Sequence, residues 1–378
     1  MPALFWHDDT PEIPNLTPSA RLMKLKNATT LQDIAREAGV SAMTVSVVLN
    51  GTNSSTRVSH TTRTRVEKVA ESLHYRPNGV ARGLSRRRMD TLGVAAETDG
   101  NSVNLHFLEI LNGILAACAV HGQNTTIFPV TNWQHDEKKL LQFCDGRIDG
   151  MLCISPMFSR SFAETLQNHT PFVTLHSDAA LSLIPNLDVD NEGGAFAIVE
   201  YLIGQGHRRI LHFAANPARS GGMLRLHGYR RALEAAGIVY DTSLVHVGEY
   251  TIDSGRLRMT TLLDRLGRDP LPTAIFCAND AIAYGCMEVL AERGIRVPEQ
   301  ISVVGFDDSL LALMTVPPLT TVRQPLRRMG GRAVEVLLQQ IRLSLAPSPL
   351  ITIPPPNIVN EVFDYEVLLR GSACPPLL

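Results

Sequence analysis

The chain has 378 residues, of which 44% are hydrophobic and 19% are charged, and this composition excludes an intrinsically disordered protein. A chain of this length is too long to fold around one hydrophobic core, so we expect two or three domains. The net charge of −2 averages unlike segments, because residues 30–90 carry ten lysines and arginines against five acidic residues. This local excess of positive charge indicates a nucleic-acid partner.

Signals for export, membrane insertion and catalysis are missing from the sequence. No apolar run reaches the ~18 residues of a membrane span, and the first residues are acidic and proline-rich where a secretory signal is basic. We therefore expect a cytoplasmic protein. The six cysteines are scattered and form no C-x-x-C pair, so we expect reduced thiols and neither a metal nor a cofactor. No G-x-S-x-G elbow or Walker loop occurs, which argues against an enzyme.

The N-terminal part divides into an arm and a helical segment. Residues 1–28 contain four prolines and no periodic pattern, so we expect a disordered arm, with Met23 as an alternative start to Met1. A helical pattern with apolar residues on one face then occupies residues 29–75. A basic stretch at residues 76–89 follows, and the sequence pattern changes after it. We expect residues 90–378 to form a separate, larger domain.

Local signals predict three helices within residues 29–75. Thr30 and Asp33 form a variant of the capping box at the start of the first helix, and Gly39 predicts its end. Ser41 is placed to cap a second helix over residues 42–49, and Ser59 to cap a third. Two short helices joined by a tight turn predict a helix-turn-helix unit, whose second helix lies in the DNA major groove. A three-helix bundle without a DNA role has the same periodicity and stays open.

From Thr91 onward, short apolar runs alternate with amphipathic segments, which predicts parallel sheets covered by helices. A second round of this alternation begins at Asp190, so we expect two similar lobes. We place the near lobe at residues 90–188 and 325–347, and the far lobe at residues 189–324 and 348–378. The predicted fold class is α/β, with an N-terminal three-helix domain in front of a two-lobed sensor.

Several motifs resemble the LacI (lactose repressor) family over roughly residues 29–376. They include TLQDIAREAGVSAMTVSVVLNG (30–51), LHYRPNGVARGLS (73–85), DVDNEGGA (188–195), CANDAIAYG (277–285), ISVVGFDDS (301–309) and PPLTTVRQP (317–325). The resemblance implies a periplasmic-binding-protein-like sensor of two Rossmann-like lobes behind the helix-turn-helix domain. It also implies a dimeric, DNA-binding transcriptional regulator, most often a repressor, that responds to a small molecule.

The resemblance assigns DNA contacts by position. Ala42, Met43 and Val47 occupy the positions that read base edges. Residues that match phosphate-contacting or other DNA-contacting positions are Thr30, Ser41, Thr44, Ser46, Asn50, Ser59, Thr62, Arg63 and Tyr75. Many family members have an arginine where Val47 stands. The three apolar side chains can favour a thymine methyl group but cannot make bidentate hydrogen bonds to a base.

Residues 77–84 resemble the hinge helix of the family, which enters the minor groove from both chains of a dimer. The DNA-contacting positions here are Asn78, Val80, Ala81 and Leu84, and Leu84 is the expected wedge between base steps. A flexible basic linker is the alternative, because Gly79 and Gly83 each lower helix propensity by about 1 kcal/mol.

In the sensor, the positions that match effector contacts are Arg225, Tyr250, Asn279 and Asp307, with His106 or Phe107 from the near lobe. A guanidinium, an amide, a carboxylate and an aromatic ring suit a sugar or polyol. Purines and phosphorylated sugars stay open as effectors. Each residue also has a plain structural interpretation, such as a helix cap for Asn279.

The predicted function is therefore an operator-binding homodimer, with a pseudo-palindromic site on the nucleoid and a carbohydrate effector. Whether the effector weakens or strengthens DNA binding is left open. A transporter's solute-binding protein and a sugar-active enzyme are the rival interpretations.

Overall fold

The computed structural model describes residues 29–50, 57–86, 88–97, 105–166, 170–177, 184–266, 270–345 and 359–377. The expected disordered arm, residues 1–28, lies outside this range. The chain divides into two compact units between Arg82 and Gly83, inside the expected hinge segment. None of the described helices is long and apolar enough to cross a membrane.

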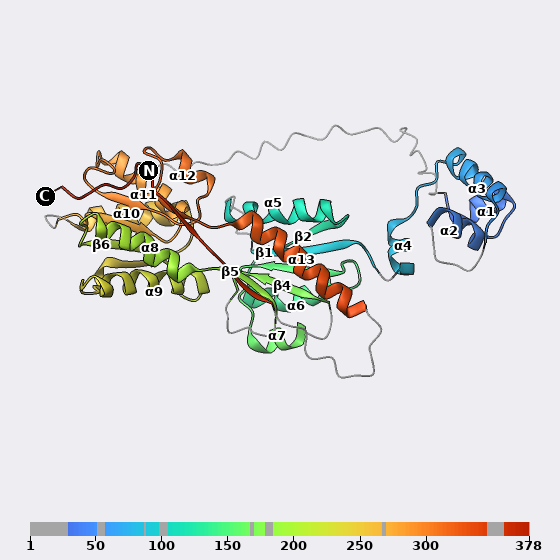
Figure 1. The fold of residues 1–378 in the computed structure, drawn as a ribbon, viewed down its shortest axis with the longest axis horizontal. Helices are drawn as coiled ribbons and strands as arrows, with labels where there is room; N and C mark the ends of the chain where they lie inside the picture. Colours follow the sequence, from blue (N-terminus) through green and yellow to red (C-terminus); the bar gives the residue numbers. More distant parts are fainter. Residues whose placement is uncertain are drawn as a thin grey trace, which may run out of the picture. The chain divides into compact units, whose positions relative to one another are not determined.

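The first unit contains the three expected helices, α1 (Leu31–Ala38), α2 (Ala42–Asn50) and α3 (His60–Ser72) (Figure 1). The capping box at the start of α1 is present, because the Asp33 N–H donates to the Thr30 hydroxyl and the Thr30 N–H donates to the Asp33 carboxylate. Gly39 ends α1 with a left-handed backbone, φ 65°. A small core joins the helices and contains Ile34, Ala35, Ala38, Val45, Val48, Val66 and Ala70.

Helix α4 (Gly79–Arg86) overlaps the segment for which the resemblance implies a hinge helix. The Asn78 side chain accepts hydrogen bonds from the N–H groups of Val80 at 2.9 Å and Ala81 at 3.2 Å, so it caps the helix. This cap offsets part of the cost of the two glycines.

The near lobe of the second unit is built on a six-stranded parallel sheet in the order β11-β5-β4-β3-β1-β2. Its strands are β1 (Thr91–Glu97), β2 (Asn124–Val130), β3 (Gly150–Ile154), β4 (Phe172–Leu175), β5 (Asn186–Val189) and β11 (Asn360–Phe363). One face is covered by α5 (Leu105–Val120) and α13 (Leu326–Leu345), and the other by α6 (Trp133–Phe143) and α7 (Arg160–Leu166) (Figure 1).

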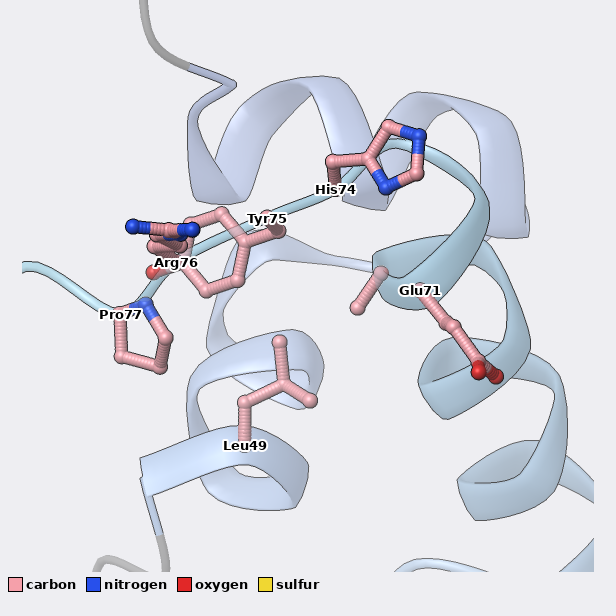
Figure 2. Close-up of a pocket in the computed structure, with 7 residues that line it drawn as sticks. Leu49, Glu71, His74, Tyr75, Arg76 and Pro77 are labelled. Atoms are coloured by element: carbon pink, nitrogen blue, oxygen red, sulfur yellow. The ribbon is translucent and has the colours of Figure 1, made fainter.

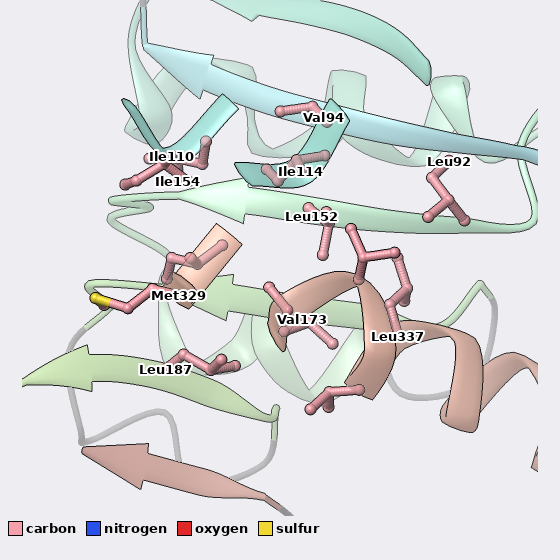
Figure 3. Packing of buried hydrophobic residues seen from close by; sticks show 14 of the residues in the cluster. Leu92, Val94, Ile110, Ile114, Leu152, Ile154, Val173, Leu187, Met329 and Leu337 are labelled. Atoms are coloured by element: carbon pink, nitrogen blue, oxygen red, sulfur yellow. The ribbon is translucent and has the colours of Figure 1, made fainter. Parts of the chain in front are cut away.

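Close helix packing shapes the near-lobe core. Ile110 and Ile114 of α5 and Met329 and Leu337 of α13 meet the apolar side chains of the central strands (Figure 3). Gly113 allows this approach, because a Cβ atom there would lie 2.0 Å from the backbone oxygen of Arg327.

The far lobe is built on a four-stranded parallel sheet in the order β7-β6-β8-β9. Its strands are β6 (Ile210–Ala215), β7 (Val245–Gly248), β8 (Ala274–Cys277) and β9 (Ser302–Val304). Helices α8 (Asn191–Gly204) and α9 (Ser220–Ala235) pack on one face, and α10 (Ile252–Leu266), α11 (Asp280–Glu292) and α12 (Leu310–Met314) on the other. A short antiparallel pair, β10 (Thr321–Arg323) and β12 (Glu366–Leu368), contacts α8.

The chain passes between the lobes after β5, after β10 and between β11 and β12. This arrangement gives two similar α/β lobes joined by three crossings. One expected boundary is wrong: residues 348–378 were assigned to the far lobe, but β11 pairs with β5 of the near-lobe sheet. The last crossing therefore follows Phe363. Strand β11 joins the near-lobe sheet because the edge strand β5 has backbone N–H and C=O groups free to pair with it.

Candidate nucleic-acid interface and effector site

Helix α2 presents a mixed surface to solvent. Met43 is 69% exposed, and Ala42, Thr44 and Ser46 are partly exposed. Val47 differs from the expectation for a base-reading position, because it is only 7% exposed. Met43 is therefore the most exposed of the three side chains expected at base-reading positions.

Four of the predicted DNA-contacting residues, Ser41, Thr44, Ser59 and Thr62, lie at the N-termini of α2 and α3, whereas Asn50 is the last residue of α2. The Ser41 hydroxyl accepts the Thr44 N–H at 3.1 Å, and the Ser59 hydroxyl accepts the Thr62 N–H at 3.2 Å. Each cap satisfies one N–H group at the start of its helix, where the helix dipole favours a phosphate. Arg63 is exposed beside the second of these caps.

In the hinge segment, Asn78, Val80 and Ala81 are exposed, and Val80 reaches 67%. Leu84 lies on helix α4, but its side chain is outside the described residues. Tyr75 is half-buried and lines a hollow of the first unit, together with Leu49, Ala70, Glu71, His74, Arg76 and Pro77 (Figure 2). The charged members of this hollow, Glu71 and Arg76, are exposed.

In the sensor, Arg225 on α9 is the centre of a buried polar group. Its Nε donates to the Asn191 side chain at 2.9 Å, and its Nη1 donates to the Ala278 carbonyl at 2.5 Å. The guanidinium lies 3.8 Å from the centroid of the Phe306 ring and 3.6 Å from the Asp307 carboxylate. The arginine is thus fixed on three sides, which pre-organises it for a ligand.

Asp307 follows β9 with a left-handed backbone, φ 121°, a strained conformation for a residue other than glycine. Burial raises its pKa to about 6, although Arg225, Gln324 and His176 each favour the ionised form. The Gln324 side-chain amide donates to the Asp307 carboxylate at 2.7 Å. Strain and a shifted pKa at one buried carboxylate are typical of a functional site.

Two further expected residues approach the same group. The Tyr250 ring lies 5.8 Å from the Arg225 guanidinium, and Asn279 donates to the Tyr250 carbonyl at 3.3 Å. The Asn279 side chain also caps α11, so its structural interpretation holds beside the functional one. A Cβ atom on Gly221 would lie 3.5–3.9 Å from the side chains of Asn191, Tyr250 and Arg225, so this glycine leaves space beside them.

The near lobe contributes two histidines. The rings of His106 and His176 are 4.8 Å apart, and His176 Nδ1 bonds the Asp188 carboxylate at 2.8 Å. Burial lowers the pKa of His106 well below its usual value, with His176 and Arg225 acting in the same direction. His106 therefore joins this group, whereas Phe107 packs against the near-lobe core.

We call this set of side chains the interlobe cluster: His106, His176, Asp188, Asn191, Arg225, Tyr250, Asn279, Asp307 and Gln324. Its members lie at or beyond the carboxyl ends of strands, where ligands bind to sheets of this kind. An Arg219–Glu97 ion pair, at 2.5 Å, joins the lobes next to it. The motif-based prediction missed His176, Asp188, Asn191 and Gln324, although Asp188 and Asn191 stand in the motif DVDNEGGA and Gln324 stands in PPLTTVRQP.

Two family models match the chain. The model of bacterial regulatory proteins of the lacI family matches residues 30–78, and the model of the periplasmic binding protein-like domain matches residues 199–360. The transcriptional repressor CytR of Escherichia coli K12 is 33% identical over 352 residues, which cover 92% of this chain and 97% of that repressor. The repressor PurR of Vibrio atlanticus is 34% identical over 317 residues, covering 83% and 92% of the two chains.

This chain belongs to the LacI family. Solved structures agree: a lac repressor dimer bound to operator and the anti-inducer ONPF has a TM-score of 0.76 and 26% identity, covering 92% of this chain and 99% of that one. The transcriptional regulator CelR in complex with cellobiose has a TM-score of 0.66 and 31% identity, covering 91% and 99%. As a LacI-family member the chain is a DNA-binding transcriptional regulator controlled by a small molecule, and it is not an enzyme.

Proposed function

We propose that the protein is a homodimeric repressor that binds a pseudo-palindromic operator on the nucleoid and responds to a sugar held by the interlobe cluster. Helix α2 lies in the major groove and helix α4 in the minor groove. Effector binding moves the near lobes of the dimer and so changes the population of hinge helices that can fold onto DNA.

The observation that carries the sugar assignment is the chemistry of the interlobe cluster. His176 Nε2 and Gln324 Oε1 are buried, and among the described residues neither has a hydrogen-bond partner. Because an unpaired buried polar atom is costly, a ligand with several hydroxyl groups would satisfy both. The Tyr250 ring, which is partly exposed beside Arg225, supplies the apolar surface on which a sugar face packs.

The dimer proposal rests on exposed apolar side chains of the far lobe. Leu310, Leu313 and Met314 on α12 are 56–61% exposed, and Val316 is 92% exposed. A contiguous apolar patch is typical of a protein interface. Two chains paired through this patch would present two α2 helices, which predicts half-sites about one helical turn apart.

Calorimetry tests the effector assignment, with cellobiose, glucose, glucose 6-phosphate and adenosine as probes. We expect heat from a neutral sugar with the wild-type chain and none with Arg225→Ala. If only the phosphorylated sugar or only adenosine binds, the effector belongs to that class and not to the neutral sugars. If Arg225→Ala gives the same heat as the wild type, the proposed site is refuted.

A further inference from the structure

Residues 88–90 join helix α4 to strand β1, and one carboxylate holds their backbone. Asp149 lies directly before β3, and its side chain is only 9% exposed. Its Oδ1 accepts the N–H of Met89 at 2.7 Å, and its Oδ2 accepts the N–H of Asp90 at 2.8 Å. Hydrogen bonds to an ionised acceptor are stronger than those between neutral groups, so this bidentate contact fixes the joint.

The near-lobe sheet reinforces the same joint. The Asn124 backbone N–H and side-chain amide donate to the Asp90 carbonyl at 2.7 and 3.2 Å. Asp149 itself donates its N–H to the Thr91 carbonyl at 2.8 Å. Asp90 has a left-handed backbone, φ 49°, and these contacts offset the strain of that conformation.

The other side of the joint is packed onto the end of α4. The Arg88 N–H donates to the Gly83 carbonyl at 2.9 Å. The Met89 side chain lies over Gly83, because a Cβ atom on Gly83 would come within 2.3 Å of the Met89 sulfur. Gly83 therefore allows the Met89 side chain to pack closely against α4. These contacts hold residues 88 and 89 against the end of the helix.

We propose that Asp149 is a positioning residue for operator binding, which sets the direction in which helix α4 leaves the near lobe. This inference rests on the proposed role of α4 in the minor groove. Without the two hydrogen bonds, residues 88–90 gain conformational freedom. Both chains of the dimer must lose this freedom when they bind DNA, which lowers the affinity. The contacts of α2 and α3 with phosphates do not depend on Asp149.

The test uses the full chain and a duplex that the wild-type protein selects from a random pool. We expect Asp149→Ala to lower the affinity about tenfold, which is the scale of fixing one or two backbone residues. Asp149→Asn keeps one acceptor oxygen, so its affinity for the duplex should lie between those of the wild type and Asp149→Ala. The matched control is Asp145→Asn, because Asp145 lies in the same loop but forms an exposed ion pair with Arg147.

A second readout separates positioning from folding. The slope of log affinity against log salt should stay at the wild-type value, because the number of phosphate contacts is unchanged. Because Asp149→Ala leaves the Met89 and Asp90 N–H groups without their acceptor, its thermal unfolding midpoint should fall below that of Asp145→Asn, so duplex affinity is compared at a temperature where both variants are folded. Wild-type affinity of Asp149→Ala under these conditions, or an equal loss of affinity in Asp145→Asn, would overturn the inference. If the wild-type chain itself selects no duplex, the proposed function fails instead.

Discussion

The Arg225 guanidinium and the Asp307 carboxylate lie 3.6 Å apart, with side chains that are only 6% and 5% exposed. A buried pair of this kind adds little to stability, but removal of one partner leaves an uncompensated charge. The arginine comes from α9 and the carboxylate follows β9, so the pair forms only when the far lobe is folded. We therefore regard it as the fixed part of the proposed effector site.

Arg225→Ala should remove the effector response and keep DNA binding. We expect sugar affinity to fall by about two orders of magnitude, because truncation of one member of a buried hydrogen-bonded pair costs about 2–5 kcal/mol. Calorimetry measures the loss, and duplex binding in the absence of sugar should match the wild type. Arg230→Ala is the matched control, since Arg230 is on the same helix with a side chain 59% exposed. Similar losses in both variants would defeat the site.

Asp307 should make stability depend on pH. Burial raises its pKa to about 6, above the unfolded value of 3.8, so the native state holds this proton more tightly. Its stabilising contribution is complete below the unfolded pKa and is lost as pH rises from about 4 through 6. Urea unfolding at pH 4 and pH 7 measures this loss. The loss should shrink in Asp307→Asn, and an unchanged pH profile in that variant would contradict the assignment.

Gly221 offers a steric test of the space beside Arg225. A larger residue there would extend past the Cβ position, which already lies 3.5–3.9 Å from Asn191, Tyr250 and Arg225. We expect Gly221→Leu to block sugar binding while the duplex affinity persists. Gly204→Ala serves as control, because nothing lies within 4 Å of its added Cβ atom. Normal sugar affinity in Gly221→Leu would place the ligand elsewhere.

Gly113 should be required for the packing of α5 on α13. A methyl group there would lie 2.0 Å from the Arg327 carbonyl oxygen, so the helices must separate. We expect Gly113→Ala to destabilise the sensor by about 2 kcal/mol, as overpacked cores do. Denaturant unfolding of the full chain measures the change against Gly204→Ala. Equal stability of the two variants would show that the helices adjust without cost.

Local signals in the sequence were sufficient for the first unit. Thr30, Asp33, Gly39 and Ser59 act through neighbours a few residues away, so their caps could be predicted residue by residue. The burial of Val47 could not be predicted, because it depends on how the chain packs around α2.

The site in the sensor depends instead on contacts between residues that are far apart in the sequence. Arg225 and Asp307 were expected from motifs, but the hydrogen bonds that orient them come from Asn191 and Gln324, and Asn191 in turn donates to Asp188. Asp188 and Gln324 lie 136 positions apart in the sequence, and only the crossing of the two lobes brings these partners together. In the same way, the contact of Asp149 with Met89 joins residues 60 positions apart and has no local signature.

Duplex binding of the full chain as a function of salt, with and without a bound sugar, tests the central claim most directly. The account predicts that log affinity falls linearly with log salt and that the sugar shifts the affinity by a constant factor. A chain that associates with no duplex at low salt, in either the presence or the absence of sugar, would contradict it.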